Sequence, residues 1–310
     1  MKYSIGVYMG GTNTDLGLVS ANGNIVQRRN LPTNAYTDFS LYIRDFMREV
    51  DAMLADQQAI DGEPLTLEGI GVGAPNGNFY TGCVDNAPNL TMKGVLDFGK
   101  EIHKYRDVPV VLSNDANAAA YGEYVYGGAK GMKHFIMFTL GTGVGSGIVV
   151  DGRLVHGSTG AAGELGHAIL YQHGRPCSCG REGCLETYTS ARGIVQTYCD
   201  LKGIPVSADV TSKMIGELAH QGDSVALKTW ETVGDQLGLA MANAVTFSAP
   251  EALFLMGGPA QVGEPLLKPL RAAFEKYLLN IFAGTCQIRM SELKANEVAI
   301  LGAAALLKMK

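Results

Sequence analysis

Three cysteines and a histidine lie close together in the middle of the sequence. Cys177, Cys179 and Cys184 fall within eight positions, although the chain has only six cysteines in 310 residues. With His167 they give the spacing H-x9-C-x-C-x4-C. Three thiolates and one imidazole form a tetrahedral ligand set typical of zinc, and such a set leaves no coordination position open. The spacing therefore predicts a structural zinc site rather than a catalytic one.

The fourth ligand of this site has an alternative, because His173 lies only four residues before the first cysteine. Glu164 and His167 also form a Glu-x-x-His pair ahead of the cysteines. A carboxylate and an imidazole at this spacing indicate a site for a polar ligand. The stretch 140–186 thus combines a metal site with a binding site.

Two strand–turn–strand units with glycine-rich turns predict a phosphate site. Glycine allows positive φ and lets a phosphate approach backbone N–H groups closely. One such turn by itself is more often a plain hairpin. Its occurrence in both halves of the chain favours two related lobes that face a common phosphate. The turns are Gly10-Gly11-Thr12-Asn13, between strands predicted at 3–8 and 16–20, and Gly141-Thr142-Gly143, between strands predicted at 135–140 and 147–150.

Asp115 follows a strand predicted at 108–112 and precedes an alanine-rich helix predicted at 116–126. Ligands of open α/β sheets bind at the carboxyl ends of strands, so Asp115 is well placed for chemistry. Aspartate is also a frequent helix N-cap, and position alone does not decide between the two roles. The loop at 86–89, Asn-Ala-Pro-Asn, is either simple turn chemistry or a source of amides for a polyhydroxylated ligand.

The remaining chain alternates helices with short apolar strands, which indicates an α/β protein of about two domains. Apolar residues at helical spacing follow Asp38 or Thr37 as N-cap and extend to residue 57. A third glycine turn, Gly257-Gly258, ends a buried strand at 253–256. Further helices are expected at 191–201, 224–247, 264–279 and 296–309, and further strands at 65–72 and 287–290.

Composition excludes several classes of protein. A net charge of -5 without a basic stripe argues against a nucleic-acid partner. No apolar run reaches the length of a membrane span, and the N-terminal apolar run is too short for a signal peptide. Six unevenly spaced cysteines do not make a secreted disulfide framework. A cytoplasmic protein is expected.

Taken together, these motifs resemble the ROK family of sugar kinases (repressors, open reading frames and kinases), with closest similarity to its bacterial glucokinases. The resemblance implies a two-lobed, actin-like (ribonuclease H-like) α/β fold with a cleft between the lobes and a small zinc-binding loop. The N-terminal lobe would comprise 1–116, joined by the C-terminal helix 296–310, and the C-terminal lobe 117–295. The matching residues are Gly10-Gly11-Thr12, Gly71-x-Gly73-Ala74-Pro75, Asn114-Asp115, Leu140-Gly141-Thr142-Gly143, Glu164-x-Gly166-His167, the cysteines with Gly180, Gly183 and Glu186, and Gly257-Gly258.

The resemblance also implies an activity, the ATP-dependent phosphorylation of glucose to glucose 6-phosphate. Asp115 would be the general base, and Mg²⁺ and a structural Zn²⁺ would be bound. His167 would bind zinc and sugar with one ring nitrogen each. A homodimer with sugar and ATP as its small-molecule partners is expected. The sugar ligands would be Gly73, Asn89, Asn114, Asp115, Glu164, His167 and Glu186; the nucleotide would contact Gly10, Gly11, Thr12, Asn13, Gly141, Thr142, Gly143, Gly257 and Gly258; and the zinc ligands would be His167, Cys177, Cys179 and Cys184.

One residue departs from the family pattern. The first phosphate turn of the family usually begins with aspartate, and Tyr8 occupies that position here. A neutral phenol cannot replace a carboxylate that helps to hold Mg²⁺, although Asp15 on the returning strand is a candidate substitute. A sugar sensor with impaired catalysis is therefore one alternative. The sugar is also open, since kinases for other hexoses and N-acetylhexosamines share this site pattern, and the donor could be polyphosphate instead of ATP. A family repressor is disfavoured because the first strand begins at Tyr3, with no helix-turn-helix segment before it.

Overall fold

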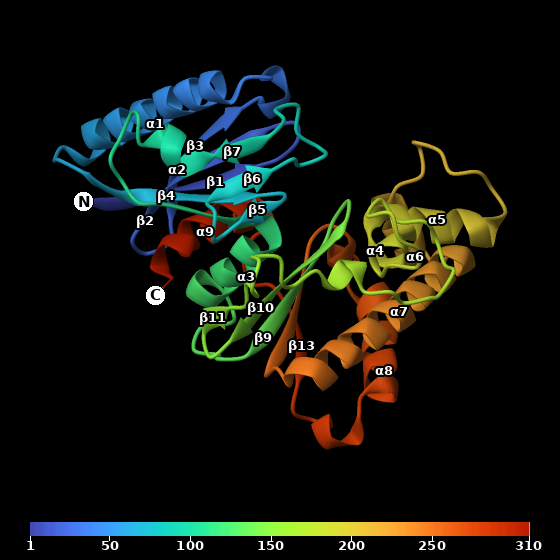
Figure 1. The fold of residues 1–310 in the computed structure, drawn as a ribbon. Coiled ribbons are helices and arrows are strands. Elements are labelled where there is room, and N and C mark those ends of the chain that lie inside the picture. Colours follow the sequence, from blue (N-terminus) through green and yellow to red (C-terminus); the bar gives the residue numbers. More distant parts are fainter. Residues whose placement is uncertain (310) are drawn as a thin grey trace. The chain divides into compact units, whose positions relative to one another are not determined.

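The structure is a computed structural model that describes residues 1–309, and these residues form two compact units (Figure 1). The first unit holds Met1–Met132, Val149–Ala162 and the chain from Glu292 onward. The second holds Lys133–Ile148 and Gly163–Ser291. The lobe boundary expected at residue 116 falls inside a helix, α3 (Asp115–Tyr126), that the first unit contains whole. The division into lobes at that boundary stays a prediction.

The first unit is built on a five-stranded mixed sheet with the order β3-β2-β1-β4-β8. The strands β1, β4 and β8 run parallel, and β2 is antiparallel to both β1 and β3. Strand β3 is not predicted from the sequence, because it lies at an edge of the sheet and its central residues, 27–30, are all polar. The strands are β1 (Lys2–Met9), β2 (Thr14–Ser20), β3 (Ile25–Leu31), β4 (Thr66–Ala74) and β8 (Val110–Asn114).

The strand before Asp115 begins two residues later than the predicted range of 108–112. Proline has no N–H to donate to a strand ladder, so the pairing with β4 starts after Pro109. The shift makes Asn114 the last strand residue and places Asp115 at the first residue of α3. A small three-stranded sheet, which the sequence patterns do not predict, lies nearby in the chain: β5 (Gly77–Asn78), β6 (Cys83–Asp85) and β7 (Val95–Asp97).

Helix α1 (Phe39–Asp61) confirms the predicted helix and its cap. The Asp38 carboxylate accepts a hydrogen bond from the Leu41 amide at 3.1 Å, and Gly62 ends the helix in the left-handed region. Its apolar side chains belong to the same buried cluster as those of β1 and β4. The other helices of this unit are α2 (Phe98–Ile102), α3, and α9 (Val298–Ala305), the last being shorter than the predicted 296–309 and followed by a 3-10 turn at Leu306–Lys308.

Helix α9 packs closely against the first sheet because glycines line the contact. A Cβ at Gly6 of β1 would lie 2.1 Å from the Ile300 carbonyl oxygen, and one at Gly71 of β4 would lie 1.9 Å from that of Ala303. Real side chains do not approach a backbone so closely, so only glycine fits at these two positions. The final helix of the chain is therefore part of the core of the first unit.

The second sheet has the order β11-β10-β9-β12-β13, and β12 runs parallel to both β9 and β13. Strands β9, β12 and β13 match the predicted ranges to within one residue, whereas β10 begins three residues before the predicted 147. The strands are β9 (Phe135–Leu140), β10 (Val144–Val150), β11 (Arg153–Leu154), β12 (Ala252–Met256) and β13 (Gln287–Met290).

Helices α7 and α8 pack against each other in the second unit (Figure 1). Gly234 and Gly238 of α7 face the backbone of α8 and allow this close approach. Trp230 of α7 is completely buried in the hydrophobic core of the second unit, as its apolar spacing predicts. The helices of this unit are α4 (Glu186–Thr189), α5 (Ala191–Lys202), α6 (Ser212–His220), α7 (Ser224–Ser248) and α8 (Glu264–Tyr277), of which α6 and the short α4 are not predicted from the sequence.

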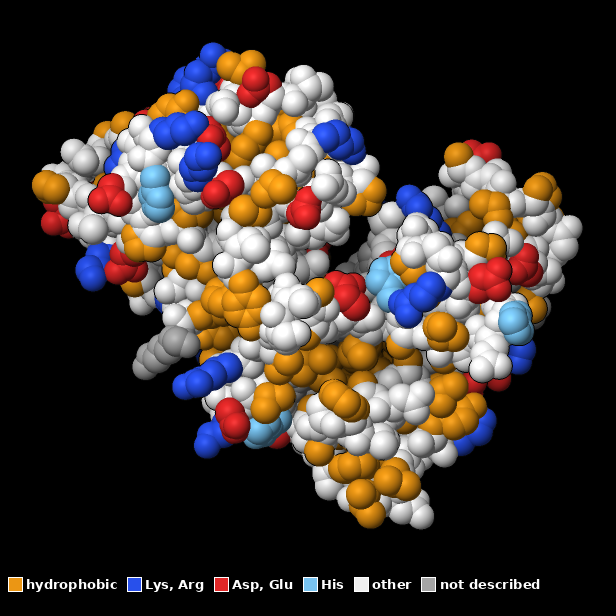
Figure 2. Space-filling view, in the orientation of Figure 1, with side chains coloured by type: hydrophobic (Ala, Val, Ile, Leu, Met, Phe, Trp, Pro, Cys, Tyr) orange, Lys and Arg blue, Asp and Glu red, His pale blue; other side chains and the backbone are white. Residues whose placement is uncertain are grey.

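Charged side chains are interspersed on the face shown in Figure 2, where Lys and Arg lie among Asp and Glu rather than in one field. Within residues 1–309, no helix combines the length and apolar character needed to cross a membrane. All six cysteines are free thiols.

Candidate functional site

The first glycine turn joins β1 to β2 and has little room for side chains. The Gly10 amide donates to the Asn13 carbonyl at 2.9 Å, and a Cβ at Gly10 would lie 2.9 Å from that same oxygen. A Cβ at Gly11 would lie 2.7 Å from the carbonyl oxygen of Asn89, one of the predicted sugar ligands. Thr12 and Asn13 are exposed. The turn thus presents backbone and hydroxyl groups beside Asn89, as an anion cradle requires.

Tyr8 lies at the centre of the predicted site in the first unit. In the sheet register it stands opposite Asp15 of β2 and beside Gly73 of β4. Directly opposed residues of antiparallel strands project from the same face, so Asp15 shares the face of Tyr8. Burial raises the pKa of the Tyr8 phenol, and the charges of Asp115 and Asp15 raise it further. Tyr8 therefore stays neutral between the two carboxylates.

Asp115 stands at the N-terminus of α3, next to Gly73. A Cβ at Gly73 would lie 3.2 Å from the Ala118 Cβ and 3.7 Å from the Asp115 Cα, so β4 and the first turn of α3 approach closely here. The N-cap of α3 is Asn114, whose side chain accepts from the Ala116 amide at 2.8 Å. Asp115 accepts from the same amide at 2.9 Å. The capping role considered for Asp115 thus falls to its neighbour.

The electrostatic state of Asp115 suits proton transfer. Burial raises the pKa of its carboxyl, while hydrogen bonds from backbone amides oppose that rise. A raised pKa makes a carboxylate a better proton acceptor, provided that it is still ionised at working pH. Asp115 with these properties, at a helix N-terminus beside a glycine, is a candidate general base.

The four candidate metal ligands of the second unit come together as predicted. One ligand atom from each of His167, Cys177, Cys179 and Cys184 lies within 4.8 Å of all the others. Cys177 Sγ is 3.6 Å from His167 Nδ1, and Cys179 Sγ is 3.6 Å from Cys184 Sγ. Ligands about 2.3 Å from a tetrahedral zinc are separated by roughly 3.7 Å, so the four atoms fit such an ion. The alternative ligand, His173, is not in this cluster.

Hydrogen bonds and burial give two thiols of this cluster very different pKa values. Hydrogen bonds from Arg181 lower the pKa of the Cys179 thiol to about 6. Burial, with its neighbouring thiols, raises the pKa of Cys184 to about 12. The Arg181 guanidinium also donates to the His167 carbonyl at 2.7 Å and so ties the two ends of the loop together. A bound cation would favour the thiolate form of all three cysteines.

Purified protein is expected to contain one zinc per chain, measured by mass spectrometry of the metal. Cys184→Ala, which removes a buried ligand, should abolish this zinc and lower the melting temperature, because structural zinc contributes directly to folding. The matched control is Cys199→Ala, which truncates a buried thiol outside the cluster and should keep the metal. Equal zinc contents in the two variants would contradict the assignment.

The second glycine turn joins β9 to β10 and is held by the segment after the cysteines. The Gly141 amide donates to the Gly143 carbonyl at 2.9 Å. Glu186 Oε2 accepts from the Val144 amide at 2.9 Å, and the Ala191 amide donates to the Gly141 carbonyl at 2.8 Å. The contact from Glu186 to this turn is not visible in the sequence, because the two residues are 42 positions apart.

The other predicted residues of the second unit lie beside these two features. Glu164 is exposed and precedes a 3-10 turn at Leu165–His167, whose His167 amide donates to the Glu164 carbonyl at 3.0 Å. Gly257 has φ of 107°, and a Cβ there would lie 1.9 Å from the Leu140 carbonyl oxygen. Gly258 faces open space. The third glycine turn thus lies against the end of the strand that carries the second.

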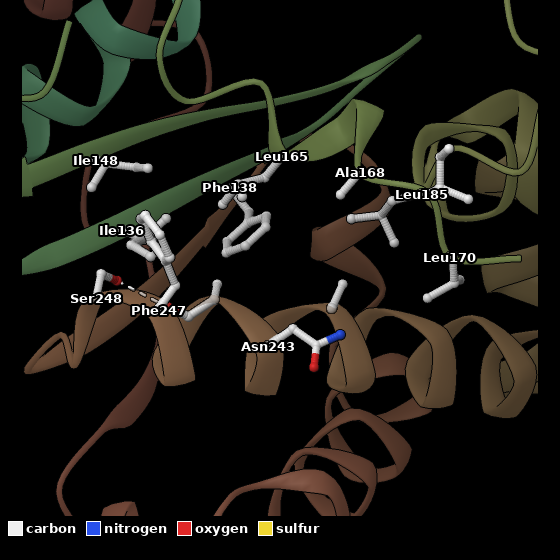
Figure 3. A pocket seen from close by; sticks show the side chains of 13 residues that line it. Ile136, Phe138, Ile148, Leu165, Ala168, Leu170, Leu185, Asn243, Phe247 and Ser248 are labelled. Atoms are coloured by element: carbon white, nitrogen blue, oxygen red, sulfur yellow. Dashed lines mark hydrogen bonds between the residues drawn. The ribbon is translucent and has the colours of Figure 1, made fainter. Parts of the chain in front are cut away.

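An apolar pocket of about 150 Å³ in the second unit is distinct from these groups (Figure 3). Residues of β9, β10 and α7 line it, together with the segment at 165–170 and Leu185. Its polar side chains are Asn243 and Ser248, and Phe247 beside them is 89% exposed. A pocket with so few hydrogen-bonding groups does not suit a polyhydroxylated ligand.

Residues 4–310 match the sequence profile described as the ROK family. The chain belongs to the ROK family. Its fold is that of the family's actin-like sugar kinases.

Several relatives in the ROK family match over nearly the full chain. The glucokinase of Halalkalibacterium halodurans is 33% identical, over 100% of this chain and 96% of its own length. A ROK family glucokinase from Streptomyces griseus, solved in complex with glucose and AMPPNP, is 30% identical with a TM-score of 0.78, over 98% of both chains. The xylose repressor of Bacillus subtilis is 28% identical, over 96% of this chain and 75% of its own length. The family therefore contains both kinases and repressors.

Proposed function

We propose that this chain is an ATP-dependent hexose kinase that converts glucose to glucose 6-phosphate. The observation that carries the proposal is Asp115, a carboxylate of raised pKa at a helix N-terminus beside Gly73. Full-length similarity to a glucokinase at 33% identity supports it, as does the structural similarity to a glucokinase bound to glucose and AMPPNP.

Each predicted residue has a definite part in the proposed reaction. Asp115 accepts the proton of the sugar hydroxyl as that oxygen attacks the γ-phosphate of ATP, and no covalent enzyme intermediate is needed. The turns at 10–13 and 141–143 hold phosphates through backbone N–H groups, and Gly257 with Gly258 lies against the adenosine. Because positioning and charge neutralisation dominate phosphoryl transfer, these contacts supply most of the rate enhancement. The sugar is held by Gly73, Asn89, Asn114, Glu164, His167 and Glu186.

Two ions would complete the site. Zinc held by His167 and the three cysteines would fix the imidazole so that its other nitrogen meets a sugar hydroxyl. Mg²⁺, when bound with ATP, neutralises phosphate charge. Asp15, which stands opposite Tyr8 in the strand register, is the carboxylate that would hold it, and Asp115 stays free to act as the base.

The decisive assay measures sugar-dependent ADP release with Mg²⁺ across a panel of hexoses and N-acetylhexosamines. The proposal expects glucose to give the highest kcat/KM. Release with another member of the panel would keep the kinase and correct the sugar, which is the first alternative. Replacing ATP with polyphosphate in the same assay tests the donor. Glucose binding without ADP release under any condition would instead establish a sugar sensor.

The sensor alternative rests on Tyr8, and one substitution tests it. Tyr8→Asp should raise kcat or the apparent Mg²⁺ affinity by about tenfold, because it adds a carboxylate beside Asp115 and Asp15. The control Tyr8→Phe removes the hydroxyl without adding charge and should bring no such gain. If Tyr8→Asp changes neither quantity, the missing carboxylate does not limit this protein.

The expected homodimer belongs to the same proposal. Light scattering on purified protein should give a mass of about twice 32.9 kDa. A monomeric mass would contradict this part of the proposal alone and leave the kinase assignment standing.

A further inference from the structure

Glu186 occupies a position between the two halves of the candidate site in the second unit. It begins α4, two residues after the metal-binding residue Cys184. Its carboxylate reaches back to the glycine turn that is predicted to hold phosphate, where Oε2 accepts from the Val144 amide at 2.9 Å. This contact is not part of the sugar-binding role that the family resemblance implies for Glu186.

The two carboxylate oxygens of Glu186 lie in different surroundings. A Cβ built on Gly143 would lie 2.4 Å from Oε2 but 4.0 Å from Oε1. Oε2 thus lies against the turn, and it can do so because Gly143 has no side chain. Oε1 is turned away from the turn. Glu186 is only partly buried, so Oε1 remains able to accept a hydrogen bond from a ligand.

The same segment holds the turn at a second point. The Ala191 amide at the start of α5 donates to the Gly141 carbonyl at 2.8 Å. Residues 186 and 191 therefore bind the turn at both of its ends, Val144 and Gly141. A change in the orientation of the Glu186 side chain acts on backbone groups of this turn directly.

A purely structural role would also explain the hydrogen bond, since a carboxylate often satisfies a backbone N–H. That role requires one oxygen and predicts no effect of sugar on the nucleotide. The position of Oε1 is what distinguishes the two roles, because a ligand on Oε1 fixes the carboxylate whose other oxygen fixes the turn.

We propose that Glu186 couples the sugar site to the phosphate turn, with Oε1 accepting a sugar hydroxyl while Oε2 holds the Val144 amide. This inference rests on the proposed kinase function. A bound sugar restricts the Glu186 side chain, and the restricted carboxylate orders the turn before ATP arrives. Coupling between two binding sites is reciprocal, so bound nucleotide tightens sugar binding by the same factor.

The coupling is measured as a ratio of dissociation constants. Calorimetry gives the Kd of AMPPNP with Mg²⁺ in the absence and presence of saturating glucose. The wild-type ratio is expected to be about fivefold or more, within the usual range of such couplings. Glu186→Asp is one methylene shorter and cannot span both partners, so its ratio should fall close to one. Glu186→Gln keeps the length and an acceptor oxygen, and it should retain part of the ratio.

Glu164→Asp is the matched control, because it shortens another acid of the proposed sugar set that does not belong to the segment 186–191. It should weaken glucose binding and leave the ratio unchanged. A wild-type ratio of one, or a full ratio in Glu186→Asp together with weakened glucose binding, would overturn the coupling. In both cases the kinase assignment would survive, since ADP release is measured separately.

A second measurement needs no ligand. Hydrogen exchange of the Val144 amide should be faster in Glu186→Asp than in the wild type, because the acceptor is withdrawn. Unchanged exchange would remove the link between Glu186 and the turn. If AMPPNP binds but no sugar of the panel does, the proposed function fails, and the coupling fails with it.

Discussion

Asp115→Asn should lower the kcat of sugar-dependent ADP release by about 10²–10⁴-fold, the usual contribution of a positioned general base. The amide keeps the size of the side chain and the oxygen that accepts from the Ala116 amide, but it cannot accept the proton of the sugar hydroxyl. Glucose binding, measured by calorimetry, should change far less than kcat. Asp107→Asn, the same change at an exposed position, is the control and should leave kcat unaltered.

The pH dependence provides an independent check of Asp115. Its carboxyl must be ionised to act as a base, and burial raises its pKa. The wild-type kcat/KM should therefore fall on acidification at a higher pH than an ordinary carboxyl would cause. This acidic limb should vanish in Asp115→Asn. Full turnover in that variant would show that another group takes the proton.

Gly71→Ala should destabilise the protein by about 3 kcal/mol or more, measured by urea denaturation. The new Cβ would lie 1.9 Å from the Ala303 carbonyl oxygen, which is helix backbone and cannot rotate away. Helix α9 would have to move off β4, with loss of packing along their contact. The expected effect is large for a single methyl group because no flexible side chain lies there to absorb it.

Gly99→Ala is the matched control for Gly71→Ala. Gly99 lies in α2, and its added Cβ would meet nothing closer than the Asp97 carboxylate at 3.7 Å. Alanine is the better helix former, so this variant should gain up to about 1 kcal/mol. Opposite signs for the same substitution would confirm the close contact of α9. A loss below 1 kcal/mol in Gly71→Ala would show that the helix adjusts easily.

Local signals in the sequence predict much of the fold. Helix α1 follows from its apolar spacing and the cap at Asp38, and β12 follows from its apolar run. Edge strand β3 is not predicted, because its central residues are all polar and the neighbouring strand decides its structure. Helix α6 is not predicted either, although Ile215, Leu218 and Ala219 have helical spacing, because it is short. Strand β8 begins only after Pro109, because proline cannot donate to the strand ladder. The apolar run at 108–112 does not by itself reveal this later start.

The candidate site also has parts that local sequence signals predict and parts that they do not. Spacing alone predicts the cysteine cluster, since its ligands lie within a short loop and their chemistry is specific. The position of Asp15 opposite Tyr8 depends on the strand register, and the bond between Glu186 and Val144 depends on tertiary packing. Neither contact can be predicted from a local sequence pattern, because each joins residues that are apart in the sequence. Among the predicted residues, the roles in sugar and nucleotide binding stay predictions.

The place of α9 in the first unit has a consequence for biosynthesis. The ribosome completes β1 at Met9, whereas the helix that packs against its Gly6 begins only at Val298. At translation rates of roughly 5–20 residues per second, β1 waits on the order of 15–60 s for this partner. The glycine-lined face of the first sheet therefore stays uncovered throughout elongation. The first part of the chain to be synthesised reaches its native packing only after nearly all of the remainder has been made.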